Sequence, residues 1–149
     1  MAKVRVTKEF SFEMAHALWN YDGPCKNIHG HSYKLFVTVI GEPINNVRDN
    51  KNGMVIDFGD LKQIVRSEIV NVFDHAVVMS KDSGYSQSQE VLDFVGNLLT
   101  LDYQPTCENL VVDFAQRIKQ LLPKEIKLHS ITLYETATSK AEWHASDNE

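Results

Sequence analysis

The N-terminal stretch of the chain alternates between apolar and polar side chains with a period of two. Its apolar side chains occupy the even positions and are Val4, Val6, Phe10, Phe12 and Met14. This alternation predicts a β-strand with one buried face. A second alternating run covers residues 31–40. Together the two runs predict an antiparallel hairpin whose strands are joined by a long, turn-rich connection.

The middle of the chain carries shorter patterns. Residues 53–56 are a short apolar run, which predicts a third strand. The apolar stripe that follows has helical spacing and ends at 73–75. Either Asp57 or Asp60 is placed to cap the start of this helix. The apolar positions within 91–99 predict another short helix.

The C-terminal third is organised around one clear helix. Pro105 and Thr106 begin it, its apolar side chains recur at helical spacing, and Pro123 ends it. Residues 128–135 then predict a strand, which a short tail follows. Runs of strands followed by runs of helices favour an α+β fold, with an antiparallel sheet that helices cover on one face. No long linker or repeat interrupts the chain, so we interpret residues 1–149 as one domain.

Composition narrows the class of protein. The chain has 149 residues, of which 43% are hydrophobic and 23% charged, the balance of a soluble globular protein. The formal net charge of -5 argues against a nucleic-acid partner, because such proteins usually carry a basic excess. No apolar run approaches the roughly 20 residues that span a bilayer, and no signal-peptide pattern is visible. We therefore expect a cytoplasmic protein with no membrane partner, in which Cys25 and Cys107 stay reduced and Cys107 is structural.

The candidate chemistry begins with three histidines. His29 and His31 are two positions apart, so on a strand they face the same side, and His16 continues the inward-facing positions of the neighbouring strand. Three neutral imidazoles with one position left open are typical of a catalytic zinc site, whereas structural zinc sites close with four protein ligands. The alternative is that one or more of these histidines only packs in the core or caps a loop.

Further candidates surround these histidines. Cys25 lies four residues before His29. A nearby cation would favour its thiolate, which makes it a candidate metal ligand, base or nucleophile; the alternative is a small buried side chain. Asp74 and His75 are a candidate acid–base pair, although neighbouring side chains often diverge. Glu135 shares the inward parity of its strand, where a ligand bearing N–H groups could satisfy its carboxylate.

Six short motifs follow one another along the chain. They are FEMAH at 12–16, CKNIHGHSY at 25–33, VIDFGDLK at 55–62, FDH at 73–75, PTCEN at 105–109 and YET at 134–136. In this order they closely resemble the 6-pyruvoyltetrahydropterin synthase / 6-carboxytetrahydropterin synthase family. The resemblance spans nearly the whole chain, and the ordered set is far more specific than any one motif.

The resemblance implies a metal centre with catalytic side chains beside it. The implied cofactor is Zn²⁺, and its implied ligands are His16, His29 and His31. Cys25 is implied as the catalytic thiol. Asp74 and His75 are implied as the proton relay.

The resemblance also implies a pterin triphosphate substrate, 7,8-dihydroneopterin triphosphate. Glu135 is implied to anchor the pterin ring through its N–H edge and to take part in the relay, with Thr106 and Glu108 lining the same pocket. The implied enzyme is a lyase. Loss of triphosphate and a retro-aldol cleavage give 6-carboxytetrahydropterin and acetaldehyde, a step of queuosine and 7-deazapurine biosynthesis. The sister reaction keeps the carbon chain and gives 6-pyruvoyltetrahydropterin.

The spacing around the thiol separates the two branches of the family. The short Cys-x3-His-Gly-His pattern resembles the 6-carboxytetrahydropterin branch, because the animal pyruvoyl enzymes have a longer insertion there. We therefore favour 6-carboxytetrahydropterin synthase, with 6-pyruvoyltetrahydropterin synthase as the alternative. A non-catalytic zinc- or pterin-binding module is a further alternative. A zinc hydrolase is a third, although no glutamate stands beside the histidines as in zinc proteases.

The family has the tunnelling fold, in which four-stranded antiparallel sheets join into a trimeric barrel and two trimers stack into a homo-hexamer. The resemblance therefore implies that a neighbouring subunit covers the open sheet face and that active sites lie at subunit interfaces. One departure is the segment 76–104, which is longer than in compact family members. It is open to interpretation as a lid, an interface element or a neutral insertion.

Overall fold

The computed structural model describes residues 2–149, and its framework is one long antiparallel hairpin. The hairpin consists of β1 (Val4–His16) and β2 (His29–Gly41), which confirms the two alternating runs. Its register pairs His16 with His29. Alternate side chains are buried from Phe10 to His16 in β1 and from Tyr33 to Val39 in β2, so each strand presents one face to the core.

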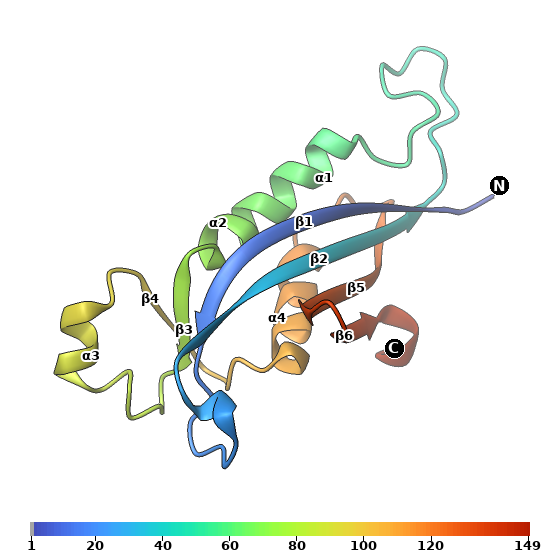
Figure 1. The fold of residues 1–149 in the computed structure, drawn as a ribbon. Helices are drawn as coiled ribbons and strands as arrows, with labels where there is room; N and C mark the ends of the chain where they lie inside the picture. The colour runs from blue at the N-terminus through green and yellow to red at the C-terminus, as the bar shows by residue number, and fades with distance from the viewer. Residues whose placement is uncertain (1) are drawn as a thin grey trace.

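Six strands form the sheet instead of the expected four. β3 (Ala76–Ser80) and β4 (Leu98–Leu101) extend it beyond β1, while β5 (Lys127–Thr136) and β6 (Ser139–His144) extend it beyond β2. The strand order is β4-β3-β1-β2-β5-β6. Because β3 runs parallel to both β1 and β4, the sheet is mixed, and the expectation of a purely antiparallel sheet is wrong. Figure 1 shows how the long strands curl.

A long helical stretch makes the crossover between the hairpin and β3, as parallel pairing with β1 requires. It consists of α1 (Phe58–Val65), a π-helical turn η2 (Arg66–Val70) and α2 (Asn71–Phe73). Of the two expected caps, Asp57 rather than Asp60 serves, because its carboxylate accepts a hydrogen bond from a backbone N–H of the first turn.

The second main helix is α4 (Cys107–Lys119). Its cap is Thr106, whose hydroxyl accepts a hydrogen bond from the Asn109 N–H at 3.2 Å. The remaining short helices are α3 (Gln89–Phe94), η1 (Pro24–Lys26) and η3 (Ala145–Asp147). Across residues 2–149 no helix is both long enough and apolar enough to cross a membrane.

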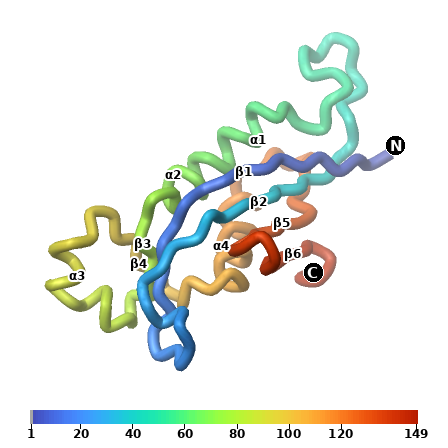
Figure 2. Tube along the Cα trace, in the orientation of Figure 1, coloured from blue at the N-terminus to red at the C-terminus, as the bar shows by residue number. Residues whose placement is uncertain are grey.

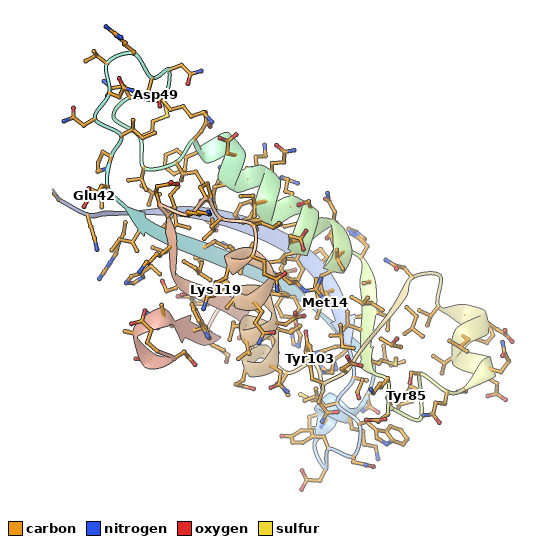
Figure 3. All side chains as sticks on the ribbon, turned by 180° about the vertical axis from the view of Figure 1, so that it is seen from behind. Met14, Glu42, Asp49, Tyr85, Tyr103 and Lys119 are labelled. Atoms are coloured by element: carbon orange, nitrogen blue, oxygen red, sulfur yellow. The ribbon has the colours of Figure 1, made fainter. Side chains whose placement is uncertain are left out.

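The helices α1, α2 and α4 lie on one face of the sheet, and the core lies between the two layers (Figures 2 and 3). Phe114 of α4 packs edge-on against Phe12 of β1 and Phe73 of α2, with ring centroids 6.2 and 5.0 Å apart. No helix covers the opposite side of β1 and β2 among the described residues, where Glu13 and Ser32 are exposed. We call this uncovered side the open face.

Two local predictions are wrong, the second of them in part. Residues 53–56 form no strand, because their backbone closes a loop in which Ile44 N–H bonds to Met54 O and Gly53 N–H to Ile44 O. The helix predicted within 91–99 forms only up to Phe94, and residues 98–99 belong to β4. The tail, for which no element was predicted, forms β6. A short apolar run fits a strand, a helix or a buried loop equally well, so only its packing partners decide which it becomes.

Candidate functional site

Three histidines meet at one end of the hairpin, on the face that the helices cover. They are His16, His29 and His31. Their ring centroids are 4.7 Å apart between His16 and His29, 4.8 Å between His29 and His31, and 5.2 Å between His16 and His31. One nitrogen of each ring lies within 4.8 Å of those of the others. The structure thus brings the three predicted metal ligands together.

Backbone carbonyls fix the orientation of two of these rings. His16 Nδ1 lies 2.7 Å from Pro105 O, and His29 Nδ1 lies 2.7 Å from Asn27 O. Because a carbonyl oxygen can only accept, each Nδ1 carries a proton and donates it there, which leaves Nε2 as the atom available to a metal ion. The two Nε2 atoms lie 3.1 Å apart. An Nδ1–H held by a carbonyl, with the other nitrogen free, is the usual arrangement of a histidine metal ligand.

Burial favours the neutral form of two of the rings, His16 and His31. His16 is 1% exposed, and its burial lowers its pKa to about 4. Burial also lowers the pKa of His31, although the charge of Glu135 opposes this shift. His31 Nε2 is buried and has no hydrogen-bond partner among residues 2–149. Three converging imidazole nitrogens, one of them without a partner among residues 2–149, fit a divalent metal ion that accepts imidazole ligands.

Glu135 and Tyr33 lie next to these histidines. Glu135 Oε1 is 3.6 Å from His31 Nε2, beyond the reach of a hydrogen bond. Tyr33 is 1% exposed, and its buried hydroxyl has no hydrogen-bond partner within the described part of the chain. Burial raises the pKa of Tyr33 well above its usual value, and the negative charge of Glu135 reinforces that shift. The Tyr33 hydroxyl therefore keeps its proton at neutral pH.

A pocket of about 190 Å³ lies against Glu135. Two further predicted substrate residues, Thr106 and Glu108, line it at the start of α4. Its other lining residues are Leu18, Cys107, Ser139 and Lys140. The structure thus brings the predicted pterin-binding residues together around one pocket. A larger cavity of about 560 Å³ lies at the other end of the hairpin, where none of the predicted site residues lines it.

The two cysteines differ in their surroundings. Cys25 lies in η1, within the loop between β1 and β2, and its thiol is free and half-buried. Its carbonyl accepts a hydrogen bond from the Leu18 N–H at 2.9 Å, which closes the loop. Cys107 is buried, its Sγ donates to Leu133 O at 3.3 Å, and burial raises the pKa of its thiol to about 11. At neutral pH Cys107 is therefore a protonated, unreactive thiol.

Asp74 and His75 form a contact pair at the edge of β1. Asp74 Oδ1 accepts a hydrogen bond from the Glu13 N–H at 2.9 Å, while Oδ2 lies 2.9 Å from His75 Nδ1. The Glu13 N–H, and after it His75, lower the pKa of Asp74. His75 has a φ of 59°, and its N–H donates to Glu13 O at 2.6 Å. Both ends of this left-handed turn are therefore tied to β1.

This pair is turned away from the three histidines. The side chain of His75 is 77% exposed and lines a depression of the open face beside Ala15, Gly30 and Ser32; of the three histidines, only His31 also lines it. These three positions alternate along β1 and β2 with His16, His29 and His31, so they point to the other side of the sheet. Within one chain, the structure does not bring the predicted relay to the predicted metal site.

Several polar groups at the site were missed by sequence reasoning. The carbonyls of Asn27 and Pro105 hold two of the rings. Every residue has a backbone carbonyl, so residue identity gave no sign that these two would do so. Tyr33 had a usable signal, because it shares the parity of His29 and His31 on the same strand. A buried tyrosine on that face needs a partner for its hydroxyl.

The chain matches a known protein family over nearly its whole length. The family model described as 6-pyruvoyl tetrahydropterin synthase matches residues 5–146. A 6-carboxy-5,6,7,8-tetrahydropterin synthase of Haemophilus influenzae is 36% identical over 147 residues, which cover 93% of this chain and 97% of that protein. The protein of the same name from Aquifex aeolicus is 29% identical, covering 95% of this chain and 98% of its own.

Solved structures share the fold. A crystal structure of an uncharacterised protein from Wolinella succinogenes superposes with a TM-score of 0.79 at 20% identity, covering 97% of this chain and 99% of that one. The 6-pyruvoyl tetrahydropterin synthase of Caenorhabditis elegans superposes with a TM-score of 0.68 at 24% identity, covering 97% of each chain. At these identities the likeness concerns the fold alone.

Proposed function

The chain belongs to the 6-pyruvoyl tetrahydropterin synthase family, and on that premise we propose that it is a 6-carboxytetrahydropterin synthase. The proposed reaction converts 7,8-dihydroneopterin triphosphate, with uptake of water, to 6-carboxy-5,6,7,8-tetrahydropterin, acetaldehyde and triphosphate. The observation that carries the proposal is the match to relatives of that name over nearly the full length of both chains. The three converging imidazoles support it, because the proposed chemistry needs a metal site.

The proposed cofactor is zinc, held by His16, His29 and His31. Neutral imidazole nitrogens suit zinc, and three protein ligands leave a position for substrate. When bound there, zinc supplies Lewis-acid polarisation of the oxygen atoms of the substrate side chain. The chain's own contribution is orientation, because Asn27 O and Pro105 O hold two of the rings with their lone pairs turned toward each other.

The proposed pterin site is the pocket beside Glu135. A carboxylate carries two acceptor oxygens, so Glu135 can take hydrogen bonds from adjacent N–H groups of the pterin ring. Thr106 and Glu108 line the same pocket and would limit the orientations in which the pterin ring binds. Because Glu135 Oε1 lies 3.6 Å from His31 Nε2, a ring anchored there places its side chain beside the histidines.

Proton transfer is the proposed task of Cys25 and the Asp74–His75 pair. Cys25 accepts a proton from the substrate side chain, and His75 exchanges a proton on the path to products. Asp74 holds the Nδ1–H of His75, which leaves Nε2 as the exchanging atom and stabilises the charged ring. Its lowered pKa keeps Asp74 ionised for this task at neutral pH.

We further propose that the relay of one chain serves the metal site of another. His75 faces the open face, opposite to the side on which the three histidines converge. A second copy packed against the open face would both cover it and bring a relay to a metal site. The proposed assembly is a homo-hexamer made of two trimers, with active sites between subunits.

Product analysis tests the proposed reaction. Zinc-loaded protein incubated with 7,8-dihydroneopterin triphosphate is expected to release acetaldehyde, and Cys25→Ala is expected to abolish turnover while keeping zinc. Formation of 6-pyruvoyltetrahydropterin without acetaldehyde would assign the chain to the sister reaction. Tight pterin binding with no product from the unmodified protein would instead identify a non-catalytic binding module.

Mixing inactive variants tests the shared site. Cys25→Ala and His75→Ala are each expected to be inactive as pure proteins. When the two are unfolded together and refolded at equal amounts, about a quarter of the sites should regain both groups, because each intact site needs one chain of each kind. If each site is built from a single chain, every mixture stays inactive.

A further inference from the structure

The segment 81–104 is the part of the chain to which the proposed function gives no role. It leaves the sheet after β3, carries α3 and β4, and ends immediately before Pro105. In Figure 1 it forms a lobe next to the loop that joins β1 and β2. We call residues 17–28 the Cys25 loop. Two contacts, one near each end of the segment, join the lobe to this loop.

The first contact is a pair of hydrogen bonds between Gln104 and the backbone of Trp19. The Trp19 N–H donates to Gln104 Oε1 at 2.9 Å, and Gln104 Nε2 donates to Trp19 O at 3.3 Å. The backbone of Gln104 is itself fixed, because its carbonyl accepts from the Thr106 N–H at 2.8 Å and from Asn109 Nδ2 at 3.0 Å. The side chain of Gln104 therefore ties the Cys25 loop to the start of α4.

The second contact holds the ring of Trp19. It meets Tyr85 edge-on, with ring centroids 5.5 Å apart. Figure 3 shows Tyr85 beside the Cys25 loop. A Cβ atom at Gly84 would lie 2.6 Å from Trp19 Cζ2, a distance that real Cβ atoms essentially never show. Only glycine at this position lets the indole ring lie against the lobe.

Both contacts act on the part of the loop that carries the thiol. Trp19 is preceded by Leu18, whose N–H donates to Cys25 O at 2.9 Å and whose side chain lines the pocket beside Glu135. Trp19 is followed by Asn20, which has a left-handed φ of 63° and turns the chain sharply. A shift of Trp19 therefore passes through one hydrogen bond to the backbone of Cys25.

We propose that the 81–104 segment positions Cys25, with Gln104 as the positioning residue and the Trp19–Gly84–Tyr85 contact as its second anchor. The segment is then neither a lid nor a neutral insertion. This inference rests on the proposed function only in giving Cys25 a catalytic role. Gln104 itself touches no reacting atom, so its loss should lower kcat by displacing the thiol and leave the binding of substrate almost unchanged.

The test compares Gln104→Leu with Gln87→Leu. The first removes both bonds to Trp19. The second is the matched control, because Gln87 lies in the same lobe and its side chain bonds, among residues 2–149, only to Lys81 O at 3.4 Å. In Gln104→Leu we expect kcat to fall about tenfold or more, because small displacements of a reacting group are costly, with KM changed less than about twofold. Gln104→Glu keeps an acceptor for the Trp19 N–H and should recover part of the lost kcat.

A second readout needs no substrate. Alkylation of Cys25 by iodoacetamide, followed by peptide mass spectrometry, should speed up several-fold in Gln104→Leu and stay unchanged in Gln87→Leu. The buried Cys107 should stay unlabelled in both variants, which shows that they remain folded. A lack of turnover of dihydroneopterin triphosphate by the unmodified protein would refute the proposed function alone. The alkylation experiment would still test the positioning role in that case. The positioning role is refuted if Gln104→Leu matches Gln87→Leu in both readouts, or if it loses zinc in proportion to kcat.

Discussion

Asp74 holds two partners with two different oxygens, so one substitution can separate its structural task from its chemical one. Oδ1 accepts the Glu13 N–H, and Oδ2 meets His75 Nδ1, each at 2.9 Å. Asp74→Asn keeps a carbonyl oxygen for the Glu13 N–H, but the position of Oδ2 is then taken by an NH₂ group, which can only donate. Asp74→Ala removes the contacts with both the Glu13 N–H and His75.

The two variants should therefore differ in stability. In Asp74→Ala the Glu13 N–H loses its acceptor, and the free energy of unfolding should fall by about 1 kcal/mol. For a chain of this length that lowers Tm by about 2–4 °C. Asp74→Asn should stay within about 0.5 kcal/mol of the unmodified protein. The carboxylate's charge adds little to these values, because 38% of the side chain is exposed and solvent screens its attraction to His75.

Turnover should not follow stability. In Asp74→Asn the NH₂ group faces His75 Nδ1, which must then accept a hydrogen bond and carry no proton. The tautomer of His75 is reversed, and kcat for acetaldehyde release should fall by about 10²–10⁴-fold although the fold is intact. Thermal melts monitored by circular dichroism and steady-state kinetics measure the two effects side by side. Full activity in Asp74→Asn would refute the assignment of Asp74 as the group that orients His75.

The pH dependence of stability provides a further check on the same carboxylate. The pKa of Asp74 is lowered in the folded chain, so the unfolded chain binds this proton more readily. The stabilisation is therefore present above the unfolded pKa and is lost as the pH falls through the folded one. Asp74→Asn should lose stability less steeply than the unmodified protein on acidification, as urea titrations at several pH values would measure.

Three other outcomes follow from the described structure. Asp57→Ala should lower the free energy of unfolding by about 1 kcal/mol through loss of the α1 cap, whereas Asp57→Asn should not; equal melts for the two would contradict the capping role. Iodoacetamide at neutral pH should modify Cys25 and spare Cys107, whose pKa is about 11, until the chain unfolds; prompt labelling of Cys107 would show that it is not buried. If the proposed zinc ion is held by the three histidines, its removal by a chelator should lower Tm, by an amount equivalent to about 4 kcal/mol when zinc is present at a thousandfold its Kd, and added zinc should restore Tm. His31→Ala should show no such response, and an equal response would place the metal elsewhere.

Much of the fold and of the metal site was readable from residue spacing. The period-two pattern of β1 and β2 fixes which side chains share a face, so the convergence of His29 and His31 followed from their separation by two positions. The secondary structure of the short apolar runs could not be predicted in the same way. Residues 53–56 became a loop because Gly53 and Met54 bond to the backbone of Ile44, and 98–99 became part of β4 because they pair with 77–78 of β3.

The sequence by itself determined the class of chemistry: three histidines in phase on neighbouring strands, a thiol close to them, and a carboxylate at the end of a later strand. Those properties depend on residue identity and local periodicity alone. Only the tertiary structure decided that Asn27 O and Pro105 O hold the rings, that Gln104 holds the Cys25 loop, and that His75 faces away from the histidines. Pro105 and Gln104 contact segments that are far away in the sequence, Asn27 contributes a backbone carbonyl, and the direction of His75 depends on how the sheet is assembled. A local pattern of side chains does not specify any of them.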